Sequence, residues 1–466
     1  MPHSPSPSAA ALPSSPVPVS DGLPVPQRYW AMATMTAALI MAVLDGVVAT
    51  MALPTIQREF AIDAAQAIWV VNAYQIAVTV SLFPLASLGD ILGYSRIYWG
   101  GLAVFTVASL ACALSDSLPL LTAARVLQGF GAAGIMSVSL ALVRHIYPAA
   151  QLGRGVGYNA LIVAVSSAAG PSIAAVILSV ASWPWLFAVN VPIGLAALVI
   201  AAKSLPRSAR SGHRFDALSA GLNAATLGLL IVGFKGLDGG QPGWLTGVEL
   251  VAALGFGVTL VRRELAQAAP LLPVDLLRRP VFALSVVTSV CSFAAQNIAF
   301  VALPFFFEDV LRRSQGDTGL LMTPWPVAVA VIAPLAGRLA DRYEPSLLSG
   351  AGLSLFAAGL GAMALLPPDP AFADVAWRMV LAGLGFGLFQ TPNNKVLVTS
   401  APKERSGGAS GIQATGRLLG QTLGAAAVGV LFSALGKADG TVWAMALGAG
   451  LCLVAGLTGS LRRMVR

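Results

Sequence analysis

The chain has 466 residues, of which 56% are hydrophobic and 10% charged, and its mean hydropathy is +0.79. A soluble domain carries about 25% charged residues, so this composition excludes a soluble globular protein and indicates a polytopic membrane protein. The net charge of +8 does not indicate a nucleic-acid partner, because the basic residues lie in short loops, where they set membrane topology.

Fourteen apolar segments follow a polar start. Residues 1–27 are rich in Pro, Ser and Ala and lack the basic start and apolar core of a signal peptide, so we expect a disordered tail. Apolar runs of roughly 17 residues or more can cross a membrane as helices. The segments are 30–53, 67–88, 97–114, 118–143, 156–181, 186–202, 217–234, 245–261, 281–307, 319–337, 347–366, 375–397, 409–435 and 442–461.

The basic residues orient these segments. With fourteen crossings both termini lie on one side, and 20 Lys and Arg residues then fall on that side against 6 on the other. Basic residues concentrate in cytoplasmic loops. We therefore expect a multi-pass membrane protein with both termini in the cytoplasm.

The chain also repeats itself at an offset of 250 to 254 residues. Three stretches recur in the same order: MALP (51–54) as VALP (301–304), PLASLGD (84–90) as PLAGRLAD (334–341), and GFG (129–131) as GLG (383–385). The repeat predicts four regions: the tail 1–27, a first six-helix half 28–203, two inserted helices 204–264, and a second six-helix half 265–466.

Two similar halves point to a class of protein. Halves that rock about a central site give alternating access, so a solute carrier is expected, whereas a channel does not need matched halves. The histidines His3, His145 and His213 lie far apart in the tail and loops, and the three cysteines fall in apolar runs. We expect no enzyme, no metal site and no cofactor.

Several motifs carry a family resemblance. They are LDGVVATMALPTI (44–56), LGDILGYSR (88–96) with its second copy GRLADRYEP (337–345), ARVLQGFGAAG (124–134), Gly157 followed by Ser166 and GPSIAA (170–175), and WPWLFAVNVPIG (183–194). They resemble the major facilitator superfamily and, within it, the fourteen-span drug:proton antiporters of the quaternary-ammonium and methyl-viologen resistance type. The resemblance implies an all-α membrane fold of two six-helix halves plus two inserted helices, and export driven by the proton gradient.

The chain departs from the family pattern at five positions. Ala86 and Ile91 stand where a Gly and an Arg are usual, and three small residues replace glycines of the antiporter signature: Ser166, Ala174 and Ala175.

Asp45 is an acid within the first apolar segment. A charge there costs at least ~2.5–3.5 kcal/mol, and intramembrane acids usually mark an ion or proton path. Burial favours the protonated carboxyl, so Asp45 can hold a proton, or a lipophilic cation in its place. The offset of 250 places Asp45 opposite Ala295, beside Gln296 and Asn297, so the second half lacks the acid. A structural ion pair or cap is the alternative.

Arg125 is the expected partner of Asp45 in proton coupling, because it lies too deep in its segment for easy snorkelling. A plain structural salt bridge is the alternative. Arg417 is a second intramembrane Arg, and its role stays open.

Substrate contacts are expected from Asp45 and from aromatic and amide residues within the segments. Aromatic faces attract cations by ~0.5–2 kcal/mol, although lipid contact or packing would place such residues there as well. The candidates are Trp69, Tyr74, Asn190, Gln296, Asn297, Trp325, Phe389, Gln390 and Asn393.

Two further groups follow from the motifs. By resemblance, Gly157, Gly170 and Pro171 are expected to form the hinge of the antiport motif, where they permit close helix approach and a bend, with plain helix packing as the alternative. By resemblance, Asp90, Arg338, Asp341 and Arg342 form a cytoplasmic gate, with local pairing of helix-end charges as the alternative.

We therefore expect a functional monomer in the lipid bilayer that exports small lipophilic cations in exchange for protons, with no nucleic-acid partner. Two alternatives remain. One is the same fold exporting a metabolite, a siderophore or an anionic compound. The other is a non-transporting receptor or a subunit of a larger membrane complex.

Overall fold

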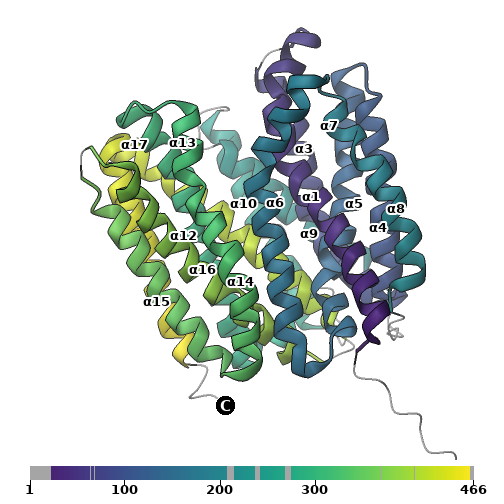
Figure 1. Ribbon diagram of the computed structural model, residues 1–466. Coiled ribbons are helices and arrows are strands. Elements are labelled where there is room, and N and C mark those ends of the chain that lie inside the picture. Colours follow the sequence, from purple (N-terminus) through teal and green to yellow (C-terminus); the bar gives the residue numbers. More distant parts are fainter. Residues whose placement is uncertain are drawn as a thin grey trace, which may run out of the picture.

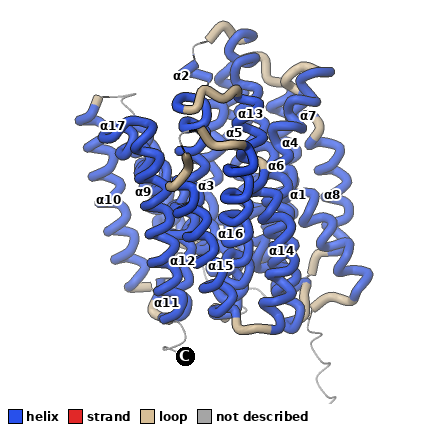
Figure 2. Tube along the Cα trace, turned by 60° about the vertical axis from the view of Figure 1, so that its left-hand side comes forward, coloured by secondary structure: helices blue, strands red, loops and turns tan. Residues whose placement is uncertain are grey.

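The computed structural model describes residues 22–62, 64–67, 69–206, 215–236, 242–267, 274–367, 369–402 and 405–461. Most of the tail that we expect to be disordered lies outside these residues. All regular elements in the described part are helical (Figures 1 and 2). The predicted all-α membrane fold is confirmed.

The first half contains six long helices and three short ones. The bounds are α1 Val25–Glu59, α2 Ala64–Ala67, α3 Trp69–Leu92, α4 Tyr94–Ala113, α5 Leu118–Ile146, the 3-10 turn η1 Ala149–Gln151, α6 Leu152–Val180, α7 Trp185–Ala188 and α8 Asn190–Ser204. Pro119 and Pro26 fall in the first turns of α5 and α1, where the missing N–H is not needed.

Two helices, α9 Ala217–Lys235 and α10 Gly243–Leu265, separate the halves in the sequence. The second half contains α11 Val274–Leu277, α12 Pro280–Phe305, the π-helix η3 Phe306–Val310, α13 Gln315–Met322, α14 Pro324–Arg342, α15 Pro345–Ala364, α16 Phe372–Ser400 and α17 Ser406–Leu461. The long α17 is two helices joined at Gly436, whose φ of 75° lies in the left-handed region.

The helices coincide with the predicted apolar segments, if α17 is taken as two. Eleven helices of the described part are long and apolar enough to cross a membrane, with α17 counted once. The protein is therefore a multi-pass membrane protein, and the count of fourteen crossings stays a prediction.

The two halves form separate bundles that lie side by side (Figure 1). Each bundle has its own buried apolar core, around Tyr98 and Phe105 in the first and around Phe356 and Phe386 in the second. α6 packs against α14, and α17 packs against α3 and α5, and these contacts join the bundles.

Close glycine contacts recur in both bundles. A Cβ on Gly131 would lie 2.4 Å from the backbone N of Phe105, and one on Gly385 would lie 2.3 Å from that of Phe356. Only glycine permits this backbone approach. The recurrence matches the offsets that the sequence repeat predicts.

The pair α9 and α10 lies at the side of the molecule (Figure 2), where α9 packs against α3 and α17. The Nδ2 of Asn223 donates to the backbone O of Val80 at 3.0 Å. Asp216, at the start of α9, is paired with Arg263 at the end of α10. Burial opposes the charge of Asp216, but hydrogen bonds from Gln267, Ser219 and Arg263 hold its pKa well below the usual range.

Candidate functional site

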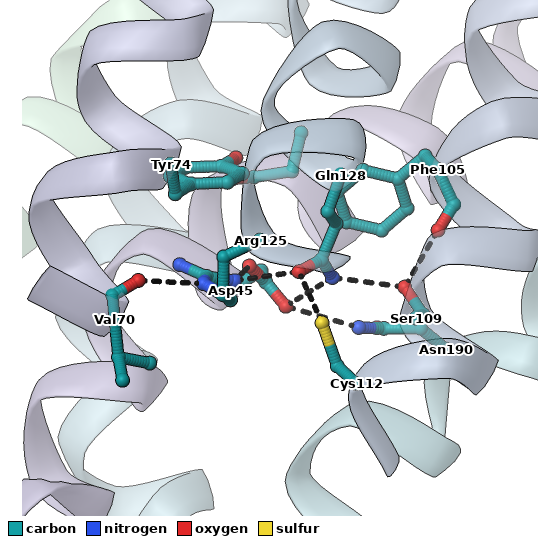
Figure 3. Close-up of polar contacts among 10 residues, drawn as sticks. Asp45, Val70, Tyr74, Phe105, Ser109, Cys112, Arg125, Gln128 and Asn190 are labelled. Carbon is teal, nitrogen blue, oxygen red and sulfur yellow. Dashed lines mark hydrogen bonds and ion pairs between the residues drawn. The ribbon is translucent and has the colours of Figure 1, made fainter. Parts of the chain in front are cut away.

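Asp45 lies on α1 at the centre of a buried polar cluster (Figure 3) and is only 3% exposed. Its Oδ2 forms an ion pair with Nη1 of Arg125 on α5, which is fully buried. Its Oδ1 accepts hydrogen bonds from Nε2 of Gln128 at 2.8 Å and from Nδ2 of Asn190 at 3.3 Å. Both carboxylate oxygens are therefore satisfied by α5 and α8.

The guanidinium of Arg125 has four further neighbours. Its Nε donates to the backbone O of Val70 at 3.0 Å, and its Nη1 donates to Oε1 of Gln128 at 2.6 Å. Its Cζ lies 4.3 Å from the centre of the Tyr74 ring and 5.4 Å from that of Phe187. Its Nη2 has no hydrogen-bond partner in the described part of the chain.

Gln128 joins this pair to α4. Its Nε2 also donates to Oγ of Ser109 at 2.9 Å, and its Oε1 accepts from Sγ of Cys112 at 3.4 Å. The expected approach of Arg125 to Asp45 is present, and Gln128 is a member that our sequence reasoning missed. Its spacing of three residues from Arg125, on one face of a helix, was the available signal.

The second half has apolar residues at the equivalent positions. The offset of 254 that relates Gly131 to Gly385 relates Arg125 to Met379 and Gln128 to Ala382, and the offset of 250 relates Asp45 to Ala295. Ala295, Met379 and Ala382 are all fully buried. The fold therefore accommodates an apolar cluster at this place, and the polar version is specific to the first half.

A cavity of about 800 Å³ lies between the two halves. Its aromatic lining residues are Tyr74, Phe293, Phe300, Trp325 and Phe386. Its amide lining residues are Gln75, Gln296, Asn297, Gln390 and Gln421. Arg417 of α17 is the charged residue among the described lining, and Ile231 of α9 also contributes.

Five of the predicted substrate contacts line this cavity: Tyr74, Gln296, Asn297, Trp325 and Gln390. The other five do not. Asp45 and Asn190 are hydrogen-bonded to each other within the buried polar cluster. Trp69 is 49% exposed at the first turn of α3. Phe389 is buried in the core of the second half, and the Nδ2 of Asn393 donates to Oγ of Ser289 at 2.8 Å.

Tyr74 contacts both the buried polar cluster and the cavity. Its ring lies over Arg125 and also lines the cavity. Its hydroxyl donates to the backbone O of Ala42 on α1 at 2.9 Å, and Ala42 lines the cavity as well. The buried polar cluster and the cavity are therefore separate sites that share the side chain of Tyr74.

The hydrogen bonds described between the two halves lie at one end of the bundle, the end where α1 begins. There Oδ1 of Asp90 accepts from the backbone N of Gly407 at 3.1 Å, while Asp341 accepts from the backbone N atoms of Gly153 at 2.7 Å and Arg154 at 3.1 Å. Each acid thus binds the first turn of a helix in the other half, where the helix dipole favours negative charge.

The two arginines of the predicted gate differ from these acids. Arg338 and Arg342 are exposed, and neither side chain has a hydrogen-bond or ion-pair partner in the described part. Two basic residues that we did not predict act at this end. Arg144 donates to the backbone O of Val398 at 2.7 Å and of Ala401 at 2.9 Å, and Lys395 pairs with Asp341 at 2.7 Å.

The predicted hinge residues lie on α6. A Cβ on Gly157 would lie 2.6 Å from the backbone O of Ala333 on α14, so this glycine permits close contact between the halves. α6 is helical through Gly170 and Pro171, and the side chain of Pro171 lies outside the described residues.

Comparison with known proteins identifies relatives over nearly the whole chain. The Major Facilitator Superfamily profile matches residues 34–425 and 286–465. The uncharacterized transporter YebQ of Escherichia coli is 54% identical, over 95% of this chain and 97% of its own. The riboflavin transporter RibZ of Clostridioides difficile is 30% identical, over 86% of this chain and 87% of its own.

The multidrug resistance protein Stp of Mycobacterium tuberculosis is 32% identical, over 85% of this chain and 74% of its own. Among solved structures, the human organic anion transporter MFSD10 aligns with a TM-score of 0.69 at 14% identity, covering 93% of this chain and 99% of its own. This last likeness concerns the fold alone.

Proposed function

The chain belongs to the major facilitator superfamily and is a transporter rather than an enzyme, and we propose that it exports amphipathic aromatic compounds from the cytoplasm in exchange for protons. The export would occur across the bacterial inner membrane by alternating access of the central cavity. The relatives named multidrug resistance protein and riboflavin transporter support a small organic substrate.

The observation that carries the proposal is the buried pair of Asp45 and Arg125 in one half of a repeated fold. Replacing a buried ion pair by apolar residues is often neutral or stabilising. The second half makes this replacement with Ala295 and Met379. Stability therefore does not account for the pair, whereas a role of Asp45 in proton exchange does.

Tyr74 links proton binding at Asp45 to the substrate site. Protonation of Asp45 removes the counter-charge of Arg125, which then has only neutral partners and the aromatic faces of Tyr74 and Phe187. Because Tyr74 lines the cavity, a shift of Arg125 changes the substrate site. Proton and substrate then bind at separate places, rather than competing for Asp45 as we expected from the sequence.

The contacts between the halves support a cycle with two states. The excess of basic residues on the side of the termini indicates that this end faces the cytoplasm. The bonds of Asp90 to Gly407 and of Asp341 to Gly153 close that end. Breaking them and packing the opposite ends together would open the cavity to the cytoplasm.

A lipophilic cation is the second candidate substrate. The aromatic lining favours it, since aromatic faces attract cations. The described lining offers the cation no carboxylate, however, and presents the positive charge of Arg417.

The test uses everted membrane vesicles from cells that produce the full chain. Respiration acidifies the vesicle lumen, so an exporter should accumulate a fluorescent aromatic dye, and an uncoupler should release it. We expect Asp45→Asn to abolish this accumulation, while Asp439→Asn, at an exposed position, should leave it unchanged. Undiminished proton-driven accumulation by Asp45→Asn would refute the assigned coupling role.

A further inference from the structure

We propose that the central cavity binds organic anions, namely planar aromatic molecules that carry a carboxylate or sulfonate, and that Arg417 is their counter-ion. This inference rests on the proposed export through the cavity and specifies the class of substrate. It reverses the charge that the sequence led us to expect.

Arg417 is a charged group without a partner among the residues that the structure describes. It is partly buried, its Nε is buried without a hydrogen-bond partner, and no described residue forms an ion pair with it. Asp45 does not line the cavity and is already bonded to Arg125, Gln128 and Asn190, and the described lining contains no carboxylate. An intramembrane charge costs several kcal/mol unless it is paired. An anionic ligand would supply the missing partner.

The rest of the lining favours an aromatic molecule with oxygen acceptors. Trp325 is 1% exposed, and its Nε1 is a second buried donor that has no partner among the described residues. Its ring packs edge-to-face with Phe300 at 5.2 Å between centroids. Gln421 lies one turn beyond Arg417, on the same face of α17, and also lines the cavity.

The repeat indicates that this charge is not imposed by the fold. Gly407 contacts Asp90 as Gly153 contacts Asp341, which relates α17 to α6 by an offset of 254. The same offset relates Arg417 to Val163, and Val163 also lines the cavity. One of two equivalent lining positions is therefore cationic and the other apolar, as expected if Arg417 serves the ligand.

The experiment compares two dyes with the same tetraethylxanthene core. Sulforhodamine B carries sulfonates and is a net anion, whereas rhodamine B ethyl ester is a net cation, and neither charge changes near neutral pH. Binding to the purified full-length protein is measured by fluorescence anisotropy. We expect the wild type to bind the anion more tightly than the cation.

The variants sharpen this expectation. Arg417→Gln should weaken anion binding by about tenfold or more, as expected for losing a charged hydrogen bond, and Arg417→Glu should reverse the preference. Arg417→Lys should keep the preference, and provides the test if the other variants fail to fold. Arg278→Gln removes the same charge from an exposed position and should change nothing.

Three outcomes would overturn the proposal: equal or tighter binding of the cationic dye by the wild type, unchanged anion binding by Arg417→Gln, or a folded Arg417→Lys without the preference. Binding is measured without a proton gradient. If the anion binds through Arg417 but vesicles show no proton-driven accumulation, the proposed export fails while the assigned ligand class stands.

Discussion

At the scale of the residue, the polar cluster of α1 and α5 is tightly specified. Asp45 uses both carboxylate oxygens, and Gln128 uses both ends of its amide, donating to Asp45 and accepting from Arg125. A buried network of this kind is costly when one member is lost, because the remaining members are left without partners. Replacing all members together avoids this cost, so the effects of the cluster on stability and on transport can be separated by mutation.

Asp45→Ala alone should lower the free energy of unfolding by about 3–5 kcal/mol, because Arg125 is left as a buried, unpaired cation. The triple variant Asp45→Ala, Arg125→Met, Gln128→Ala, which installs the residues of the second half, should recover most of this loss but not transport. Thermal unfolding followed by tryptophan fluorescence measures the stability of both variants, and dye accumulation in the vesicles measures their transport.

Asp439→Ala serves as the control, since this acid is exposed and should not affect the unfolding temperature. A triple variant as unstable as Asp45→Ala would mean that the polar cluster is needed for the fold. The apolar residues of the second half would then not be able to replace the polar cluster of the first half.

Arg417→Gln is expected to behave in the opposite way from Asp45→Ala. Arg417 has no hydrogen-bond or ion-pair partner in the described part of the chain, so removing its charge relieves a cost without breaking a described bond. The unfolding temperature of the ligand-free protein should stay equal or rise in the same assay. A clear drop would indicate that Arg417 holds the bundle together.

At the scale of the element, the seam between α6 and α14 depends on glycine. A Cβ on Gly337 would lie 2.4 Å from the backbone O of Gly153, and one on Gly157 would lie 2.6 Å from that of Ala333. These contacts join the two halves at the end where Asp90 and Asp341 accept hydrogen bonds from the opposite half. The seam is thus a close contact, and the proposed transport cycle requires the halves to part there.

Gly337→Ala should shift the protein toward the state open at this end, because the methyl group meets backbone atoms that cannot move aside. Spin labels on the exposed positions 92 and 347, one in each half, report the separation by double electron–electron resonance. The labels are attached in a background in which the three native cysteines are replaced. In this background we expect Gly337→Ala to increase the population of longer distances.

The matched control is Gly350→Ala on α15, where an added Cβ meets nothing within 4 Å. Its distance distribution should match that of the wild type. If Gly337→Ala also leaves the distribution unchanged, the seam is not the closing contact.

At the scale of the whole molecule, the sequence predicted the helices well because apolar length is a local property. The first predicted segment, 30–53, lies within α1, which extends beyond it at both ends with polar residues that hydropathy does not select. The repeat also identified Asp45 and Ala295 as unlike partners. These results follow from composition and spacing alone.

The lining of the cavity could not be predicted in the same way. Trp69 and Tyr74 lie five residues apart on α3, yet Trp69 is exposed at the helix start and Tyr74 lines the cavity. Which face of an apolar helix turns inward is set by packing against its neighbours. For the same reason, the sequence did not reveal that Asp45 is outside the cavity and Arg417 inside.

In the proposed cycle, substrate leaves as protons enter through Asp45. This exchange is tested by purified protein in liposomes, loaded with the dye that binds best, in a weakly buffered medium without an imposed pH gradient. As dye flows out, a pH electrode should record alkalinisation of the medium, and Asp45→Asn should show none. Acidification of the medium with dye efflux, or equal alkalinisation by Asp45→Asn, would contradict the account.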